Sequence, residues 1–97
     1  MSENVAIHGR ITVENSSEMR TTLANALRKK PPNLTVDLSG VTYIDSSGLA
    51  TLIEAVRIAR KRGTRLILAG LHDQPQYLLE ITHLDSLFDI VGKEPDR

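Results

Sequence analysis

Apolar positions in the first third of the chain change from an alternating to a helical spacing, which predicts a strand followed by a helix. Apolar and polar residues alternate over Val5–His8, and the alternation extends toward Ile11 and Val13. Four later apolar residues recur at the spacing of one helix face: Met19, Leu23, Ala26 and Leu27. They predict a helix over residues 15–30, which Pro31-Pro32 ends because proline cannot continue a helix.

The middle of the chain predicts a second strand and a long helix. Apolar residues alternate over 33–38, and a second short apolar patch over 41–44 leads to Asp45. From Ser46 to Arg62 the apolar face is wide, so this helix is expected to pack deeply against a sheet. We expect that face to be lined by Leu49, Leu52, Ile53 and Val56. Gly63 ends the helix, since glycine readily adopts the backbone conformation that closes helices.

Polar motifs mark two other helix starts. Asn15 can accept a hydrogen bond from a free backbone N–H and Glu18 can reach back, as in a capping box. The run Asp73–Gln76 combines a cap residue, an early proline and a capping glutamine, and it opens a helix that extends to Leu84.

Strands and helices therefore alternate to the end of the chain. Residues 65–69 form an apolar strand and residues 88–91 a last one before a polar tail. This order predicts an α/β fold, a small and largely parallel (mixed) β-sheet with helices packed against it. With 97 residues, the chain is expected to form a single domain, 1–97.

Composition narrows the classes of function. Only 3% of residues are aromatic against 40% hydrophobic, so the core is aliphatic and base-stacking platforms for nucleic acid are not expected. The absence of cysteine excludes disulfides, thiol catalysis and cysteine-ligated zinc. There is no apolar run of about 18 residues and no signal peptide, so we expect a cytoplasmic protein without direct membrane insertion.

The formal net charge is zero, but the basic residues gather near the end of the long predicted helix. They are Arg57, Arg60, Lys61, Arg62 and Arg65. Cations in the last turn of a helix complement its macrodipole, and this interpretation is favoured over a nucleic-acid patch. Direct nucleic-acid binding is therefore not expected.

The segment Asp45-Ser46-Ser47-Gly48 stands where an apolar strand enters the long helix. The first turn of a helix has unpaired N–H groups and a partial positive charge, which favour an anion such as phosphate. Gly48 has no side chain, so another molecule could approach the backbone closely. A simple helix cap is the favoured explanation of these four residues taken alone, but it does not explain the longer pattern around them.

Residues 36–50, Val-Asp-Leu-Ser-Gly-Val-Thr-Tyr-Ile-Asp-Ser-Ser-Gly-Leu-Ala, closely resemble the signature of the STAS family. This is the domain of bacterial anti-sigma-factor antagonists and of related transporter-associated proteins. The signature is an apolar strand with an acid, a short turn, and an aliphatic-Asp-Ser-Ser/Thr-Gly-Leu run entering a helix. The resemblance extends over roughly residues 5–91.

The resemblance implies a non-enzymatic switch with no cofactor. In the family the serine that directly follows the aspartate is the phosphorylation site, which corresponds to Ser46. The implied partner-binding residues are Asp45, Ser46, Ser47, Gly48 and Leu49. The unphosphorylated form binds an anti-sigma factor that is also a serine kinase; phosphorylation releases the antagonist and a phosphatase resets it.

A second function within the family stays open. STAS domains also serve as cytoplasmic accessory subunits of ABC-type lipid transporters, docked on the transporter ATPase. The Ser46-Ser47 pair favours the sigma pathway, whereas Gly9–Thr12 lacks the acids of the family and favours the transporter subunit. The family's usual final helix has no counterpart after Val91, and the apolar patch that this would expose suggests a homodimer.

Other kinds of site fit the sequence less well. A phosphorelay receiver needs an acidic pair for magnesium, which the first predicted strand lacks. A serine hydrolase needs a G-x-S-x-G-like elbow, and Ser46 follows Asp45 instead. His8, His72 and His83 are isolated in sequence and are expected to be surface or capping groups, so no metal site is predicted.

Overall fold

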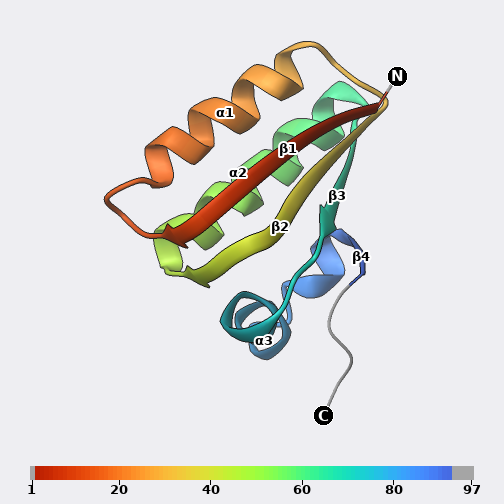
Figure 1. Ribbon diagram of the computed structural model, residues 1–97. Coiled ribbons are helices and arrows are strands. Elements are labelled where there is room, and N and C mark those ends of the chain that lie inside the picture. The colour runs from red at the N-terminus through yellow and green to blue at the C-terminus, as the bar shows by residue number, and fades with distance from the viewer. Residues whose placement is uncertain (1, 93–97) are drawn as a thin grey trace.

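The computed structural model describes residues 2–92 of the protein (Figure 1). The elements are β1 (Ser2–Ile11), α1 (Ser16–Arg28), β2 (Asn33–Ile44), α2 (Ser46–Arg62), β3 (Arg65–Ala69), α3 (Asp73–Ile81), a short 3-10 helix η1 (Asp85–Leu87) and β4 (Asp89–Val91). The predicted polar tail lies mostly outside the described residues. Between residues 2 and 92, none of the helices combines the length and apolar character needed to cross a membrane.

The four strands form one sheet in the order β1-β2-β3-β4, and every neighbouring pair is parallel. The predicted α/β class is confirmed, and the described sheet is wholly parallel where a mixed one was allowed. In Figure 1, α1 runs beside α2, which passes behind β1, and α3 lies near the end of β2. Among residues 2–92, no helix layer covers the opposite face of the sheet.

The core lies between the sheet and the two long helices. Alternate residues of β2 are buried, with Leu34, Val36 and Leu38 fully covered, and Leu66 and Leu68 continue this layer in β3. All are aliphatic, as the composition predicted. Burial of this kind stabilises a fold by roughly 25 cal/mol for each Å² of apolar surface removed from water.

The bounds predicted for α2 and β3 agree with the structure. Gly63 closes α2 with a left-handed backbone at φ 75°, as expected. β2 differs, because the two apolar patches predicted around it belong to one continuous strand. Its pairing with β1 is shifted twice, between Ala6 and His8 and between Gly9 and Arg10. Each shift places one extra residue in β2, so its buried positions change from a spacing of two to a spacing of three.

The helices α1 and α3 begin where the sequence predicted, but the capping roles expected at these two starts are wrong. Asn15 stands at the N-cap of α1 but gives its helix no side-chain hydrogen bond; its amide closes the preceding loop instead. The cap residue of α3 is His72 and not Asp73, which lies inside the helix with φ 50°. α3 also ends at Ile81, earlier than predicted, because the chain turns at His83 with a positive φ.

The buried face of α2 is turned slightly from the predicted one. Leu52 is fully buried and Val56 is 4% exposed, as expected, but Leu49 and Ile53 are only partly buried. Ala55 and Ala59 are also buried, and Ala55 lies on the side of α2 that faces α1.

Substitution of Leu52 by alanine should therefore lower the free energy of unfolding by about 2–5 kcal/mol, since the cavity lies in the closed core. Ile53→Ala removes the same number of carbon atoms from a partly exposed site and should cost clearly less. Urea denaturation of both variants measures the two losses. An equal or larger loss for Ile53→Ala would show that this orientation of α2 is wrong.

Candidate functional site

The segment 45–49 lies where β2 ends and α2 begins, at the carboxyl end of the parallel sheet (Figure 1). Ligand and partner sites of open parallel sheets commonly lie at this edge, because loops there connect strand ends to helix starts. The structure thus brings the predicted site residues together at the surface end of one strand-to-helix junction.

Asp45 is the N-cap of α2, and its carboxylate accepts four hydrogen bonds. Oδ1 accepts from the Ser47 N–H at 2.9 Å, the Ser47 hydroxyl at 2.6 Å and the Gly48 N–H at 3.1 Å. Oδ2 accepts from the Val13 N–H at 3.0 Å, across 32 positions of sequence. One side chain therefore ties the β1–α1 loop to the first turn of α2.

These donors hold the pKa of Asp45 below its ordinary value. The Ser47 hydroxyl is the largest cause, followed by the Gly48 N–H, because each hydrogen bond favours the charged carboxylate. Asp45 is thus an anion already present at the positive end of α2. The phosphate-binding position expected at this helix start is largely filled by the protein's own carboxylate.

The two serines of the motif differ in chemical state. Ser46 is exposed, and its hydroxyl makes no hydrogen bond within the described part of the chain. Ser47 is half-buried, and its hydroxyl proton is directed at Asp45. An enzyme approaching from solvent therefore meets a free hydroxyl at Ser46 and an engaged one at Ser47.

Gly48 is buried, which changes its expected role. A Cβ placed there would lie 2.8 Å from the Cγ2 atoms of both Ile11 and Ile44. The missing side chain lets the first turn of α2 pack onto the ends of β1 and β2. It leaves no open approach for a partner to the backbone at Gly48.

The β1–α1 loop presents Val13 beside this site. Asn15 braces the loop, accepting from the Thr12 N–H at 2.9 Å and donating to the Arg10 carbonyl at 2.8 Å. The Val13 side chain is 75% exposed, although the sequence pattern placed it near a strand. The bond to Asp45 fixes the Val13 backbone, so this apolar residue is held exposed at the edge of the site.

Gln74 is a site residue that the sequence analysis did not single out. Its side-chain amide donates to the Ile44 carbonyl and accepts from the Ile44 N–H, both at 2.9 Å. The pairing of β3 with β2 ends at Asp37, so Gln74 replaces the missing strand neighbour at Ile44. On the other side, the Asp45 N–H donates to the Ile11 carbonyl at 3.0 Å. The residues before Ser46 are thus fixed from both sides.

Comparison with known proteins identifies the family of this chain. A family model described as "Mlab, STAS domain" matches residues 2–92. This chain belongs to the STAS domain family. The chain is 31% identical over 91 residues to an anti-sigma-B factor antagonist of Listeria monocytogenes, covering 94% of this STAS domain and 80% of that protein.

Of two further curated relatives, one has the same name as the Listeria protein and the other a different one. The anti-sigma-B factor antagonist of Bacillus subtilis is 32% identical over 89 residues, covering 92% of this STAS domain and 81% of that protein. The intermembrane phospholipid transport system binding protein MlaB of Escherichia coli is 35% identical over 49 residues, half of each chain.

Solved structures share the fold of this STAS domain. An anti-sigma factor antagonist from Mycobacterium paratuberculosis has a TM-score of 0.77 at 22% identity, covering 92% of this chain and 75% of that one. The anti-sigma factor antagonist SpoIIAA in its unphosphorylated form has a TM-score of 0.69 at 11% identity, covering 99% and 81%. The fold expected from the sequence motif is confirmed.

Substitution of Gly48 by alanine should destabilise the domain by about 1–3 kcal/mol, because the new methyl group overlaps Ile11 and Ile44. The direction of the change in unfolding free energy is informative, since replacing glycine by alanine within a helix ordinarily stabilises a protein by up to about 1 kcal/mol. Thermal and urea denaturation measure the effect. A more stable variant would contradict the packing described for Gly48.

Substitution of Asp45 by alanine should lower stability at neutral pH, with a loss that shrinks in acid. The folded pKa of Asp45 is depressed, so its stabilisation is full above the ordinary value of 3.8 and is lost as the pH falls through the lower folded pKa. The pKa of Asp37 is also lowered, by the Ser39 N–H, but Asp37 is present in both proteins. Urea denaturation across this range measures the difference. Ser46→Ala, which removes no hydrogen bond, is the control; a difference independent of pH would contradict this role of Asp45.

Proposed function

We propose that this STAS domain is a non-enzymatic anti-sigma-factor antagonist that binds an anti-sigma kinase and is released by phosphorylation at Ser46. The observation that carries the proposal is the exposed, unengaged Ser46 hydroxyl beside the carboxylate cap of α2. The antagonists of Listeria and Bacillus, related over more than nine-tenths of this chain, support the same function. The proposal implies a cytoplasmic protein that needs no cofactor, with a phosphatase as its second partner.

The proposed docking surface centres on Ser46. Val13 supplies exposed apolar area on one side, and Leu49, half-buried one turn along α2, lies on the helix itself. Asp45 and Ser47 support this surface from below through their mutual hydrogen bonds. A kinase that binds here has the acceptor hydroxyl within its own interface, which links recognition to modification.

Phosphorylation at Ser46 would act on this surface more than on the fold. A phosphate adds about −1.5 to −2 charges at pH 7. The helix dipole favours that charge, but Asp45 opposes it and already occupies the N–H groups of Ser47 and Gly48. The two effects on stability oppose each other. The partner, in contrast, must remove water from a new anion next to the apolar Val13, which weakens docking.

A second candidate function is an accessory subunit of an ABC-type lipid transporter. The half-length relationship to MlaB favours it, as does the description of the matching family model. In that case the same surface around Ser46 would dock on the transporter ATPase without a phosphorylation cycle. Homodimer formation is compatible with either function.

The Ser46→Asp variant should keep nearly the wild-type melting temperature and bind the cognate kinase at least about tenfold more weakly, since a buried unpaired charge costs several kcal/mol. Ser46→Ala should bind like the wild type and resist modification. Ser47→Ala, the matched control, should still be phosphorylated. Isothermal titration with the kinase, and fragment mass spectrometry after incubation with ATP, measure these outcomes.

Capture of the tagged protein from its own cells separates the two functions. Co-purification of a soluble ATP-binding kinase that modifies Ser46 supports the antagonist. Co-purification of a membrane-bound ATPase complex with no modification supports the transporter subunit. Phosphate found on Ser47 would contradict the assignment based on the free Ser46 hydroxyl.

A further inference from the structure

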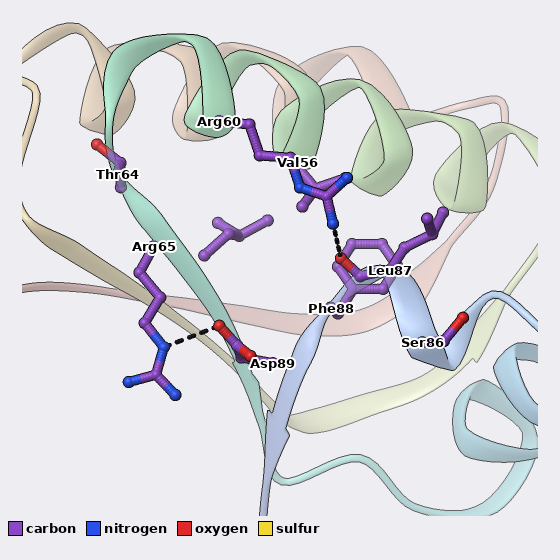
Figure 2. Close-up of a pocket in the computed structure, with 9 residues that line it drawn as sticks. Val56, Arg60, Thr64, Arg65, Ser86, Leu87, Phe88 and Asp89 are labelled. Carbon is purple, nitrogen blue, oxygen red and sulfur yellow. Dashed lines mark hydrogen bonds and ion pairs between the residues drawn. The ribbon is translucent and has the colours of Figure 1, made fainter.

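An open cavity lies at the end of α2 opposite to Ser46, lined by the last turns of α2, the start of β3 and the η1–β4 segment (Figure 2). Its volume is about 270 Å³. One water occupies about 30 Å³ of liquid, so the space is large enough for a small organic molecule. The cavity belongs to no part of the proposed switch.

Core residues form the floor of this cavity. Val56 of α2, Leu66 of β3 and Phe88 before β4 line it and are 4%, 3% and 7% exposed. They are held by the packing of α2 on the sheet, so the floor is rigid. Only a small part of each side chain reaches the cavity, so the floor offers a limited apolar contact and most of the accessible lining is polar.

Two arginines supply the polar walls. Figure 2 shows Arg60 descending from α2 toward η1, and Arg65 paired with Asp89 on the other side of the cavity. Arg60 donates through Nη2 to the Leu87 carbonyl at 3.0 Å, and Arg65 donates through Nε to Asp89 Oδ2 at 2.8 Å. A guanidinium has five N–H donors, so each arginine is oriented by one bond and keeps four donors without a partner in residues 2–92.

The charge balance of the cavity is positive. Arg60 and Arg65 face one lining carboxylate, Asp89, which is already paired with Arg65. Pre-oriented guanidinium donors recognise carboxylate and phosphate groups through charge-assisted hydrogen bonds.

We propose that this cavity is a binding site for a small organic anion. Its phosphate or carboxylate group is held by Arg60, with Arg65 as the second donor, and its apolar portion lies against Val56, Leu66 and Phe88. The helix dipole explains why basic residues lie near the end of α2. It does not explain why Arg60 and Arg65 are both held in place beside a cavity with buried apolar residues at its base. The site is independent of the function proposed for Ser46.

Titration of the whole protein with phenyl phosphate, followed by ¹⁵N–¹H NMR, tests the site. Saturable binding in about the millimolar range or tighter is expected, with shifts centred on residues 64–66 and 86–89 and not on the Ser46 segment. Inorganic phosphate should bind more weakly, since it makes no contact with the floor. Arg60→Gln should weaken phenyl phosphate by about tenfold and Arg65→Gln by several-fold, as loss of a charged donor predicts.

Arg57→Gln is the matched control, because it removes the same charge from α2 but does not line the cavity. It should leave the affinity nearly unchanged. Equal weakening by all three substitutions would reduce the effect to general electrostatic attraction and overturn the proposal. Absence of saturation, or unchanged binding in Arg60→Gln and Arg65→Gln, would also overturn it; the melting temperature of each variant shows that the fold is intact. If the function proposed for Ser46 proves wrong, the expected outcome of this titration does not change.

Discussion

The site depends on one carboxylate, that of Asp45. Its four hydrogen bonds connect the β1–α1 loop, the end of β2 and the first turn of α2, which are separate along the chain. A charged acceptor at a helix N-terminus satisfies N–H groups that the helix cannot pair and interacts favourably with the helix dipole. Because Oδ2 also reaches Val13, the same charge that starts α2 fixes the loop beside it. The surface around Ser46 is therefore ordered before any partner arrives.

Packing beneath the carboxylate makes this arrangement possible. Gly48 lets the first turn of α2 rest on Ile11 and Ile44, and Gln74 holds Ile44 at the point where β3 no longer pairs. The Asp45 cap and the apolar contact at Gly48 both fix the first turn of α2. An exposed serine on such a turn has a defined backbone, so a kinase or a docking partner meets one conformation and pays little ordering entropy.

Sequence was sufficient where local rules and tertiary packing agree. The wide apolar face and Gly63 defined α2, and the aliphatic alternation defined β3, so both were predicted to the residue. It failed where a competing contact replaces the one that the local signal predicts. Asn15 looks like a cap, but the β1–α1 loop uses its amide. The spacing of buried residues in β2 changes because its pairing with β1 contains two bulges, and the sequence of β2 alone does not show how it pairs with another strand.

In the site, too, local features could be predicted from the sequence and contacts with other elements could not. The motif identified Ser46 and the cap at Asp45, since both follow from one short segment entering a helix. It could not separate a free hydroxyl at Ser46 from an engaged one at Ser47, because that difference depends on which way the Asp45 oxygens turn. Gln74 and Val13 were missed for a related reason: each reaches the site from another element, by contacts 30 and 32 positions away in sequence.

The two ends of α2 are chemically opposite and electrostatically separate. From Ser46 to Arg60 the helix rises roughly 20 Å, at about 1.5 Å per residue. The Debye length at physiological ionic strength is about 8 Å, so a phosphate on Ser46 is largely screened from the guanidinium groups at the far end. Any influence of one end on the other must therefore pass through movement of α2 on the sheet. The fully buried Leu52 and Ala59 oppose such movement, and close-packed cores have few alternative arrangements. Two sites on one rigid helix can thus be occupied independently, which allows a second ligand without disturbing the switch.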